Sequence, residues 1–338
     1  MDQVKAVMRY HHYAYRTEQS YCDWIYKYIL FHNNKHPDQM GGTEIEAFLS
    51  HLALSRKVSA STQRQALNAL IFLYHRVLEK PIREEIKPIR AKRKPKLPVV
   101  MTQGEVKRVL GYMKGTHLLM AQLLYGGGLR LMECVRMRIQ DIDFERKMIY
   151  VNTTKGGKHR ITLLPDYIIG DLHAHIEKVK EIHEKDISEG YGETYLPESL
   201  ARKDPHAAKE FRWQYVFPSK RLSKDPRTGV VRRHHVLESG LQKAVKTAVQ
   251  RTGIPKRITC HTFRHSFATH LLENGVNIHV VQELMGHSNV KTTEIYTHVM
   301  EKDISAVRSP LDLLEESETS PCFTVSRRTE PQDPSEIP

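Results

Sequence analysis

The segment from His261 to His298 brings together residue types that can act on a phosphate group. It contains imidazoles at His261 and His287, a guanidinium at Arg264 and a phenol at Tyr296. Arginine can bind phosphate oxygens through two parallel hydrogen bonds, and histidine can transfer protons near neutral pH. A phenol has a pKa of about 10, so it is a weak nucleophile that needs activation by its neighbours. This set of residues suggests a tyrosine that attacks a phosphodiester.

Three short helices are expected to position these side chains. His261 and Arg264 are three residues apart at the start of the first helix, so they lie on one face, and Asn274-Gly275 ends it. A second helix is expected over roughly 277–285, where Gly286 ends it and places His287 in a tight turn. A third begins near 288 and carries the tyrosine about two turns later. The expected buried stripe of the second helix is Val280, Val281 and Leu284.

Composition points to a polyanionic partner. The chain has 338 residues, enough for two domains, and a net charge of +13. No apolar run approaches the roughly 18–20 residues of a membrane-spanning helix, and the amino terminus lacks the apolar core of a secretory signal. The four cysteines are scattered without a C-x-x-C pair, which favours reduced thiols in a cytoplasm. We therefore expect a cytoplasmic protein that binds nucleic acid rather than a membrane.

The 20 histidines raise the question of a metal site. His261 and His265 are four residues apart, a spacing that could place two ligands on one helical face. Arg264 lies between them, however, and its positive charge opposes a bound cation. No H-E-x-x-H motif occurs. We therefore expect neither a structural nor a catalytic metal.

The first 80 residues are expected to form a helical domain. Apolar residues recur at helical spacing over about 17–32, 43–54 and 59–78, and basic residues lie around them as candidate DNA contacts or solvated charges. Residues 81–98 hold four prolines and seven Lys or Arg against two Glu. This composition predicts an extended basic linker, for which a path along a nucleic-acid backbone is favoured over a merely soluble one.

A second domain is expected over 99–308, and it contains two further chemical candidates. Arg130 follows three glycines, which allow the backbone to approach a ligand closely, and Glu133 one turn later could orient its guanidinium. By itself, such an Arg–Glu pair is usually structural. Residues 147–165 alternate as two strands around a K-G-G-K turn at 155–158, where a lysine is ordinarily a solvated charge.

A long interval separates this hairpin from His261. It contains a helix near 171–185, followed by aromatic residues interleaved with basic ones. That mixture suits stacking on unpaired bases beside a phosphate path. Trp213 and Phe217 could instead be local core, which composition alone favours slightly. Beyond Pro310 the chain is acidic and rich in Pro, Ser and Thr, so 309–338 is expected to be a mostly disordered tail.

Four motifs resemble those of the tyrosine recombinases, the phage-integrase-like enzymes that break and rejoin DNA. They are GLRLME, TKGGKHR, HTFRH and GHSNVKTTEIYTH, in the family's order, within a resemblance that covers roughly residues 15–300. The resemblance implies a mostly α fold with a small β-sheet (α+β), in which a helical core-binding domain and a catalytic domain form a C-shaped clamp on DNA. The implied catalytic residues are Arg130, Lys155, His261, Arg264, His287 and Tyr296, with Glu133 in an orienting role.

The resemblance also implies a mechanism. The two arginines clamp the non-bridging phosphate oxygens while Tyr296 forms a 3′-phosphotyrosyl intermediate and releases a 5′-hydroxyl. Lys155 is then the general acid and His261 the candidate general base, and His287 donates a hydrogen bond to the phosphate. Because the covalent intermediate retains the free energy of the broken bond, no ATP, cofactor or metal is expected. Synapsis implies a homo-tetramer around two DNA sites.

The interval before His261 further resembles the insertion of integron integrases, over about 183–235. It is carried by the stretches YLPESLARK, WQYVFPS and RRHH. In that subfamily the segment recognises extrahelical bases of a folded single-stranded site, and the residues that match by position are Trp213, Pro226, His234 and His235.

The expected function is therefore integration and excision of integron gene cassettes, at folded single-stranded cassette sites and a duplex integron site, by a nucleoid-associated bacterial protein. Two alternatives remain. One is a duplex-only recombinase of the phage or chromosome-dimer-resolving type, against which the long interval around Trp213 argues. The other is a non-catalytic DNA-binding relative, against which the complete set of catalytic residues argues.

Overall fold

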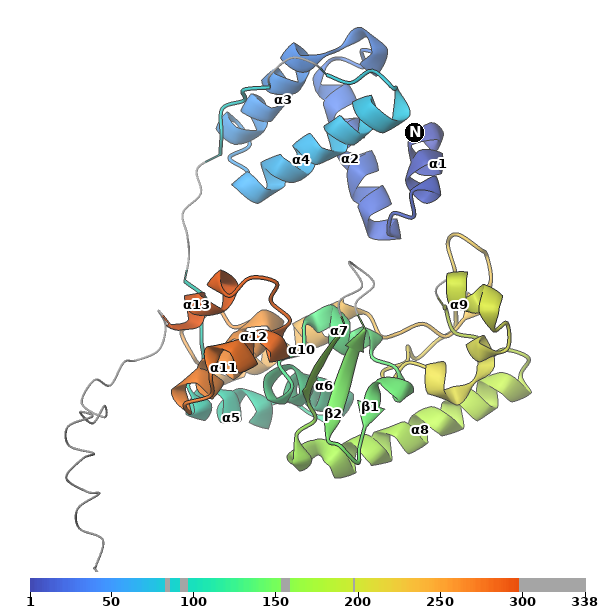
Figure 1. Cartoon of the computed structure of the whole chain (residues 1–338), viewed down its shortest axis with the longest axis vertical. Helices are drawn as coiled ribbons and strands as arrows, with labels where there is room; N and C mark the ends of the chain where they lie inside the picture. Colours follow the sequence, from blue (N-terminus) through green and yellow to red (C-terminus); the bar gives the residue numbers. More distant parts are fainter. Residues whose placement is uncertain (83–85, 92–96, 153–158, 197, 298–338) are drawn as a thin grey trace, which may run out of the picture. The chain divides into compact units, whose positions relative to one another are not determined.

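The computed structural model describes residues 1–82, 86–91, 97–152, 159–196 and 198–297. Lys155 and the expected tail lie outside these residues. The chain divides into two compact units, Met1–Lys96 and Leu97–Pro338 (Figure 1). Both are built mainly from helices, with one three-stranded and one two-stranded sheet in the described part of the second unit. The expected fold class, mostly α with a small β-sheet, is confirmed.

The first unit packs its helices around two buried tyrosines. The hydroxyls of Tyr28 and Tyr74 lie 3.0 Å apart, and Tyr74 Oη donates to the carbonyl of Pro37 at 3.1 Å, so these buried polar groups are satisfied. An additional helix precedes the three that the periodicity indicated, and its Val4 and Met8 are buried in the same core. The helices are α1 (Asp2–Tyr10), α2 (Tyr15–Phe31), α3 (Gly42–Leu54) and α4 (Ala60–Phe72), with a π-helical turn at Leu73–Val77.

The second unit begins with a helix whose start the sequence predicts. Thr102 Oγ1 accepts a hydrogen bond from the backbone nitrogen of Glu105 at 3.2 Å, and the Glu105 carboxylate accepts one from the backbone nitrogen of Thr102 at 2.8 Å. This is the expected capping box. The helices of the unit are α5 (Gln103–Gly111), α6 (Gly115–Gly126), α7 (Leu131–Arg136), α8 (Ile169–Ser188), α9 (Glu198–Lys203), α10 (Glu238–Thr252), α11 (Cys260–Glu273), α12 (Ile278–Met285) and α13 (Lys291–Thr297).

The predicted hairpin forms the larger sheet. Strands β1 (Ile142–Asp143), β2 (Met148–Asn152) and β3 (His159–Leu163) are antiparallel in the order β1-β2-β3. Residue Arg160 of β3 pairs with Val151 of β2, and β3 contacts α12. A small second hairpin joins β4 (Ser223–Lys224) to β5 (Val231–Arg232).

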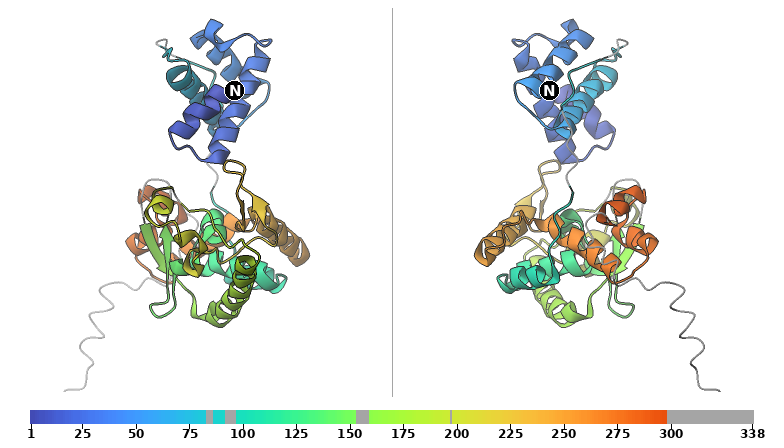
Figure 2. Two further views of the ribbon diagram at one scale, coloured as in Figure 1. Left: turned by 90° about the vertical axis from the view of Figure 1, so that its right-hand side faces the viewer. Right: turned by 90° about the vertical axis from the view of Figure 1, so that its left-hand side faces the viewer.

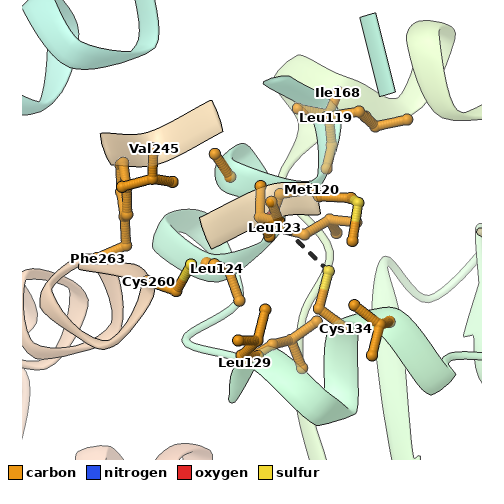
Figure 3. Close-up of a cluster of buried hydrophobic side chains, with 14 of the residues drawn as sticks. Leu119, Met120, Leu123, Leu124, Leu129, Cys134, Ile168, Val245, Cys260 and Phe263 are labelled. Atoms are coloured by element: carbon orange, nitrogen blue, oxygen red, sulfur yellow. Dashed lines mark hydrogen bonds between the residues drawn. The ribbon is translucent and has the colours of Figure 1, made fainter. Parts of the chain in front are cut away.

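The core of the second unit is organised around α6. Its Leu119, Met120, Leu123 and Leu124 pack with side chains from α7, α10 and α11, and the thiol of Cys134 donates to the Met120 carbonyl at 3.8 Å (Figure 3). Helix α10 was not expected from the sequence. The sequence feature that indicates this helix is a stripe of apolar residues at helical spacing, which is buried in the structure. Gly253 follows it in the left-handed conformation and ends the helix. That stripe consists of Leu241, Val245 and Ala248.

Helices α11, α12 and α13 pack against one another, and they appear together in orange and red in both views of Figure 2. The buried residues of α12 are Val281 and Met285. Val280 is 46% exposed, so its expected place in the buried stripe is wrong. Among the described residues, no helix combines the length and apolarity needed to cross a bilayer.

Replacing Leu123 by alanine should lower the free energy of unfolding of the second unit by about 2–5 kcal/mol, because it opens a cavity in a fully buried part of α6. The matched change Leu237→Ala, at a side chain that is 68% exposed, should cost less than about 0.5 kcal/mol. Urea unfolding in a Trp24→Phe background isolates the fluorescence of Trp213, the remaining tryptophan. Equal costs for the two changes would contradict the packing of α6.

Candidate active site

One carboxylate holds three arginine side chains together. Glu133 Oε1 accepts a hydrogen bond from Arg130 Nη1 at 2.7 Å, and Glu133 Oε2 accepts one from Arg160 Nη2 at 2.6 Å. Arg264 Nη1 lies 3.9 Å from the same Oε2. Although burial alone raises the pKa of Glu133, the charge of Arg160 and the hydrogen bonds and charge of Arg130 outweigh it and lower that pKa. A single negative charge opposes three positive ones, so the site retains excess positive charge that favours an anion.

Arg264 is buried and its guanidinium is oriented by backbone carbonyls. It donates from Nη1 to the carbonyl of Gly128 and from Nη2 to the carbonyl of Met285. Arg130 Nη2 lies 3.4 Å from the carbonyl oxygens of both Met285 and Gly286. Carbonyls at the end of a helix lack partners within that helix, so the end of α12 can accept from both arginines. Burial first, and then the charges of Arg130 and Arg160, lower the pKa of Arg264 to about 9, which leaves it charged at neutral pH.

Two glycines allow these elements to approach one another. Gly128 has a φ of +58°, and a β-carbon there would lie 2.4 Å from Phe267 Cδ1. Gly286 has a φ of +60°, and a β-carbon there would lie 2.4 Å from Arg160 Cδ. The expectation that the glycines before Arg130 make room for a ligand is therefore corrected, because protein atoms occupy that space.

The phenol of Tyr296 lies among histidines. Tyr296 is 4% exposed on α13, and its Oη is 2.9 Å from Nδ1 of His265. Its ring lies nearly parallel to that of His287, with an interplanar angle of 17° and centroids 6.2 Å apart. Burial raises the pKa of Tyr296, and the charges of Arg264 and Arg130 offset part of that increase.

The two histidines expected in the site differ in their surroundings. His287 Nδ1 lies 2.9 Å from Thr293 Oγ1. Burial, and then the charges of Arg264, Arg130 and Arg160, lower the pKa of His287 to about 4. His261 lies in the first turn of α11 and is more exposed. Desolvation, and then the charges of Arg264 and Arg130, lower the pKa of His261. Both imidazoles are therefore neutral at pH 7 and can donate a hydrogen bond to an anion.

The structure gathers most of the expected catalytic set and adds residues that sequence analysis missed. Arg130, His261, Arg264, His287 and Tyr296 lie around one another, whereas Lys155 lies outside the described residues. The additions are Arg160 and His265. The alternation of β3 could have indicated Arg160, because it places that side chain on the same face as the buried Thr162. For His265, the four-residue spacing from His261 indicated only a possible metal ligand.

Within the described ranges, no group of three or more His, Cys, Asp or Glu side chains is arranged to hold a metal ion. The rings of His261 and His265 have centroids 6.3 Å apart, and His265 is engaged with the Tyr296 hydroxyl. The charges nearest these histidines are those of arginines. The arrangement therefore suits an anionic group rather than a cation.

The candidate base-recognition residues belong to the segment 213–235, which lies in the part of the second unit that carries α8 and α9 (Figure 1). The guanidinium of Arg138 lies 4.7 Å from the ring centroid of Tyr215 and 6.0 Å from that of Trp213. It donates to the carbonyl of Trp213, and to that of Tyr195 at 2.7 Å. Arg212 approaches the Trp213 ring from 5.9 Å. Trp213 is partly buried among these groups.

The groups just described, Arg138, Arg212, Trp213 and Tyr215, form the cluster around Trp213. The remaining candidates divide between this cluster and the small hairpin. The rings of His234 and His235 have centroids 4.0 Å apart, and both contact Tyr215 edge-on. His234 is exposed, whereas His235 is buried with Nδ1 2.7 Å from the carbonyl of Val236. Pro226 is exposed in the turn between β4 and β5. The structure thus links Trp213, His234 and His235 through Arg138 and Tyr215, and it places Pro226 at the end of the hairpin.

Glu133→Gln should lower the free energy of unfolding at pH 7 by about 3 kcal/mol, because it leaves buried guanidinium groups without a counter-charge. The pKa of Glu133 is lower in the folded chain than its ordinary value of 4.5, so its stabilisation is complete above that value and is lost as pH falls through the folded pKa. The difference between the proteins should therefore shrink below about pH 4.5. Unfolding from pH 7 to about pH 3 tests this, with exposed Glu145→Gln as control. A difference that is independent of pH would contradict it.

Gly286→Ala should destabilise the fold by about 1–3 kcal/mol, because φ is positive there and the new methyl group meets Arg160. The control is Gly111→Ala at the end of α5, where a β-carbon has open space and φ is negative. That change should be neutral or stabilising by up to about 1 kcal/mol. Thermal unfolding compares the two, and a stable Gly286→Ala variant would show that α12 does not need this conformation.

Comparison with known proteins identifies the family. Residues 99–303 match the phage integrase family, and residues 1–84 match the phage integrase N-terminal SAM-like domain. The chain is 47% identical over 316 residues to an integrase/recombinase of Escherichia coli, covering 93% of each chain. It is 34% identical over 236 residues to the tyrosine recombinase XerA of Thermococcus onnurineus, covering 69% of this chain and 70% of that protein.

A solved structure has the same fold. The crystal structure of a lambda integrase dimer bound to a COC′ core site aligns with a TM-score of 0.58 and 16% identity, covering 91% of this chain and 97% of that one. The family model spans the hairpin, the arginines around Glu133 and the helix that carries Tyr296. The chain therefore belongs to the phage integrase family, and it is a site-specific tyrosine recombinase that acts on DNA.

Proposed function

We propose that this recombinase cuts DNA by attack of Tyr296 on phosphorus, which forms a 3′-phosphotyrosyl bond and releases a 5′-hydroxyl. The observation that carries the proposal is the position of the Tyr296 phenol within a site of excess positive charge. The charges of Arg264 and Arg130 act on that phenol. They oppose its burial and favour the anionic form that bonds to phosphorus.

The proposed roles follow from exposure and orientation. Arg264 is held by backbone carbonyls, and the Arg130 side chain is 39% exposed, so one guanidinium is fixed and the other faces solvent. Together they would bind the non-bridging oxygens and stabilise charge in the transition state. Glu133 orients them, His287 donates a hydrogen bond to the phosphate, and Lys155 protonates the leaving oxygen. A histidine of the HTFRH segment takes the proton of the tyrosine, and no cofactor or metal has a role.

We further propose that the substrates are integron gene cassettes, at folded single-stranded sites and a duplex integron site, and that four protomers form the synaptic complex. The cluster around Trp213 supports this substrate. It presents a partly buried indole with two guanidinium groups beside it, at 6.0 and 5.9 Å from the ring centroid, and the exposed Tyr191 and Tyr195 are nearby in sequence. Aromatic faces beside positive charge suit unpaired bases and their phosphates. Residues 1–80 and the 81–98 linker would contact the same DNA as the catalytic domain, in a bacterial cytoplasm.

A duplex recombinase of the chromosome-dimer-resolving type is equally compatible with the comparisons. The chain is similar to a protein named XerA. A structure of the recombinase XerH, bound to a palindromic difH substrate, aligns with a TM-score of 0.54 and 19% identity. A non-catalytic DNA-binding relative is the third candidate. Covalent chemistry separates it from the other two, and the form of DNA that is cut separates those two from each other.

A denaturing gel with labelled DNA tests the nucleophile and the substrate together. Wild type should form an SDS-resistant adduct with a folded single-stranded cassette site, and Tyr296→Phe should bind that DNA but form none. Trp213→Ala should reduce the amount of adduct on the folded strand by about 10- to 100-fold, because it removes the ring on which one unpaired base would stack. Cleavage of duplex DNA should be unchanged.

Tyr167→Ala is the matched control for the tryptophan, since its ring is 85% exposed in the same unit and outside the cluster. Adduct on duplex alone would favour the chromosome-dimer-resolving alternative. Tight binding without adduct on a suicide substrate of either form would favour the non-catalytic one.

A further inference from the structure

His265 makes a contact that none of the roles above uses. Its Nδ1 lies 2.9 Å from Oη of Tyr296, and the two residues are 31 positions apart in the chain. Among the described residues, His265 is the hydrogen-bond partner of that hydroxyl. Its ring centroid lies 5.6 Å from that of the tyrosine, so the two rings meet at their polar edges and do not stack.

We propose that His265, rather than His261, accepts the proton of the Tyr296 hydroxyl when the tyrosine attacks phosphorus. The proposal rests on Tyr296 being the nucleophile. It makes the HTFRH segment bifunctional, with one histidine serving the phosphate and the other, four residues later, serving the nucleophile.

The chemical state of His265 is compatible with this role. For Nδ1 to accept the proton, the neutral ring must carry its own hydrogen on Nε2. Burial, and then the neighbouring His261 and the charge of Arg264, lower the pKa of His265 to about 4. The ring is therefore unprotonated at pH 7 with a lone pair available.

Substrate binding should strengthen this base. The groups that face His265 are His261 and Arg264 on its own helix, Tyr296 on α13 and His287 between α12 and α13. A phosphodiester bound to the arginines adds negative charge, which offsets the positive charge that disfavours protonation of His265. The imidazole thus becomes more basic when the scissile phosphate is in place, so deprotonation of the tyrosine is coupled to occupancy of the site.

The step is balanced. A lone pair of Tyr296 Oη forms the new bond to phosphorus, and the hydroxyl proton passes to His265 Nδ1. The bond from phosphorus to O5′ breaks, its electron pair stays on O5′, and that oxygen takes a proton from the general acid. Rejoining runs the same transfers in reverse, with a 5′-hydroxyl as nucleophile and the tyrosine oxygen as leaving group. No co-reactant is needed.

His261 is placed for a different task. It lies one turn earlier on α11, is more exposed, and has no hydrogen bond to the Tyr296 hydroxyl among the described residues. The charges that act on it are those of Arg264 and Arg130. A phosphate held by these arginines would lie beside His261, which can donate a hydrogen bond to it.

The test separates proton acceptance from positioning. Asparagine places its Oδ1 near the position of histidine Nδ1, so His265→Asn keeps a hydrogen-bond acceptor for Tyr296 but has no useful basicity. His265→Leu removes both properties. His279→Asn, on the exposed surface of α12, is the matched control. Each protein is assayed for DNA binding and for the single-turnover rate of adduct formation on a suicide substrate that wild type cleaves.

If His265 is the base, His265→Asn and His265→Leu should both bind DNA normally and cleave it about 100-fold or more slowly, while His279→Asn matches wild type. The rate of His265→Asn should rise about tenfold per unit from pH 7 to pH 9, because attack then requires the phenolate, whereas the wild-type rate should stay nearly flat. His265→Gln provides a second basicity-free variant should the asparagine protein bind DNA poorly.

Three results would overturn the proposal. His265→Asn at the wild-type rate with a slow His265→Leu would reduce His265 to a positioning residue. Wild-type rates for both would remove it from the reaction. Slow variants without the rise at high pH would exclude proton acceptance. In each case adduct formed by wild type and absent from Tyr296→Phe leaves the proposed nucleophile intact, whereas absence of adduct in wild type would remove both.

Discussion

The carboxylate of Glu133 is the interaction on which the rest of the site depends, because it lies between guanidinium groups that would otherwise repel one another. It binds Arg130 and Arg160 directly and lies near Arg264. The compensation is incomplete, since one negative charge faces three positive ones. The fold therefore holds the arginines at close range while leaving the excess charge that a phosphate would neutralise. Without this carboxylate, gathering three arginines would carry a large electrostatic cost.

Helix α11 transmits the rigidity of the core to this charged cluster. Its Phe263 and Ala268 are fully buried and its Phe267 nearly so. Arg264 and His265 lie between them in the sequence, and His261 lies two residues before Phe263. Side chains on a helix that is packed on α6 are held more firmly than side chains on a loop. The tyrosine sits instead on α13, a helix of seven residues that packs on α11 and α12. Arg264 is thus held by a helix of the core, and the nucleophile is carried by a smaller helix that packs on it.

The cluster around Trp213 is held to the same unit by other means. Arg138, just after α7, donates to carbonyls of the insertion and lies over two aromatic rings, and Arg233 Nη2 donates to Asp186 of α8 at 2.6 Å. This combination of positive charge and aromatic surface is what supports the proposed contacts with bases.

Local sequence patterns were sufficient for the elements whose signals are short-range. The capping box at Thr102, the hairpin of β2 and β3 and the stop of α12 at Gly286 all form where the pattern predicts. The motifs likewise identified the family and supplied the candidate catalytic residues. Helix α10 carries only a short apolar stripe, Leu241, Val245 and Ala248, among polar residues, so its helical spacing is a weak signal.

Only the tertiary structure determined which faces of the helices are buried and which distant residues contact one another. Half of the eight residues of α12 are isoleucine, valine or leucine, so only packing against α11, α13 and β3 selects Val281 over Val280 for burial. The pairing of Glu133 with Arg160 spans 27 residues, and that of His265 with Tyr296 spans 31. Sequence determined which groups are available and which helices and strands carry them. Which group touches which depends on how those elements pack, because contacts between distant residues leave no periodic trace in a single chain.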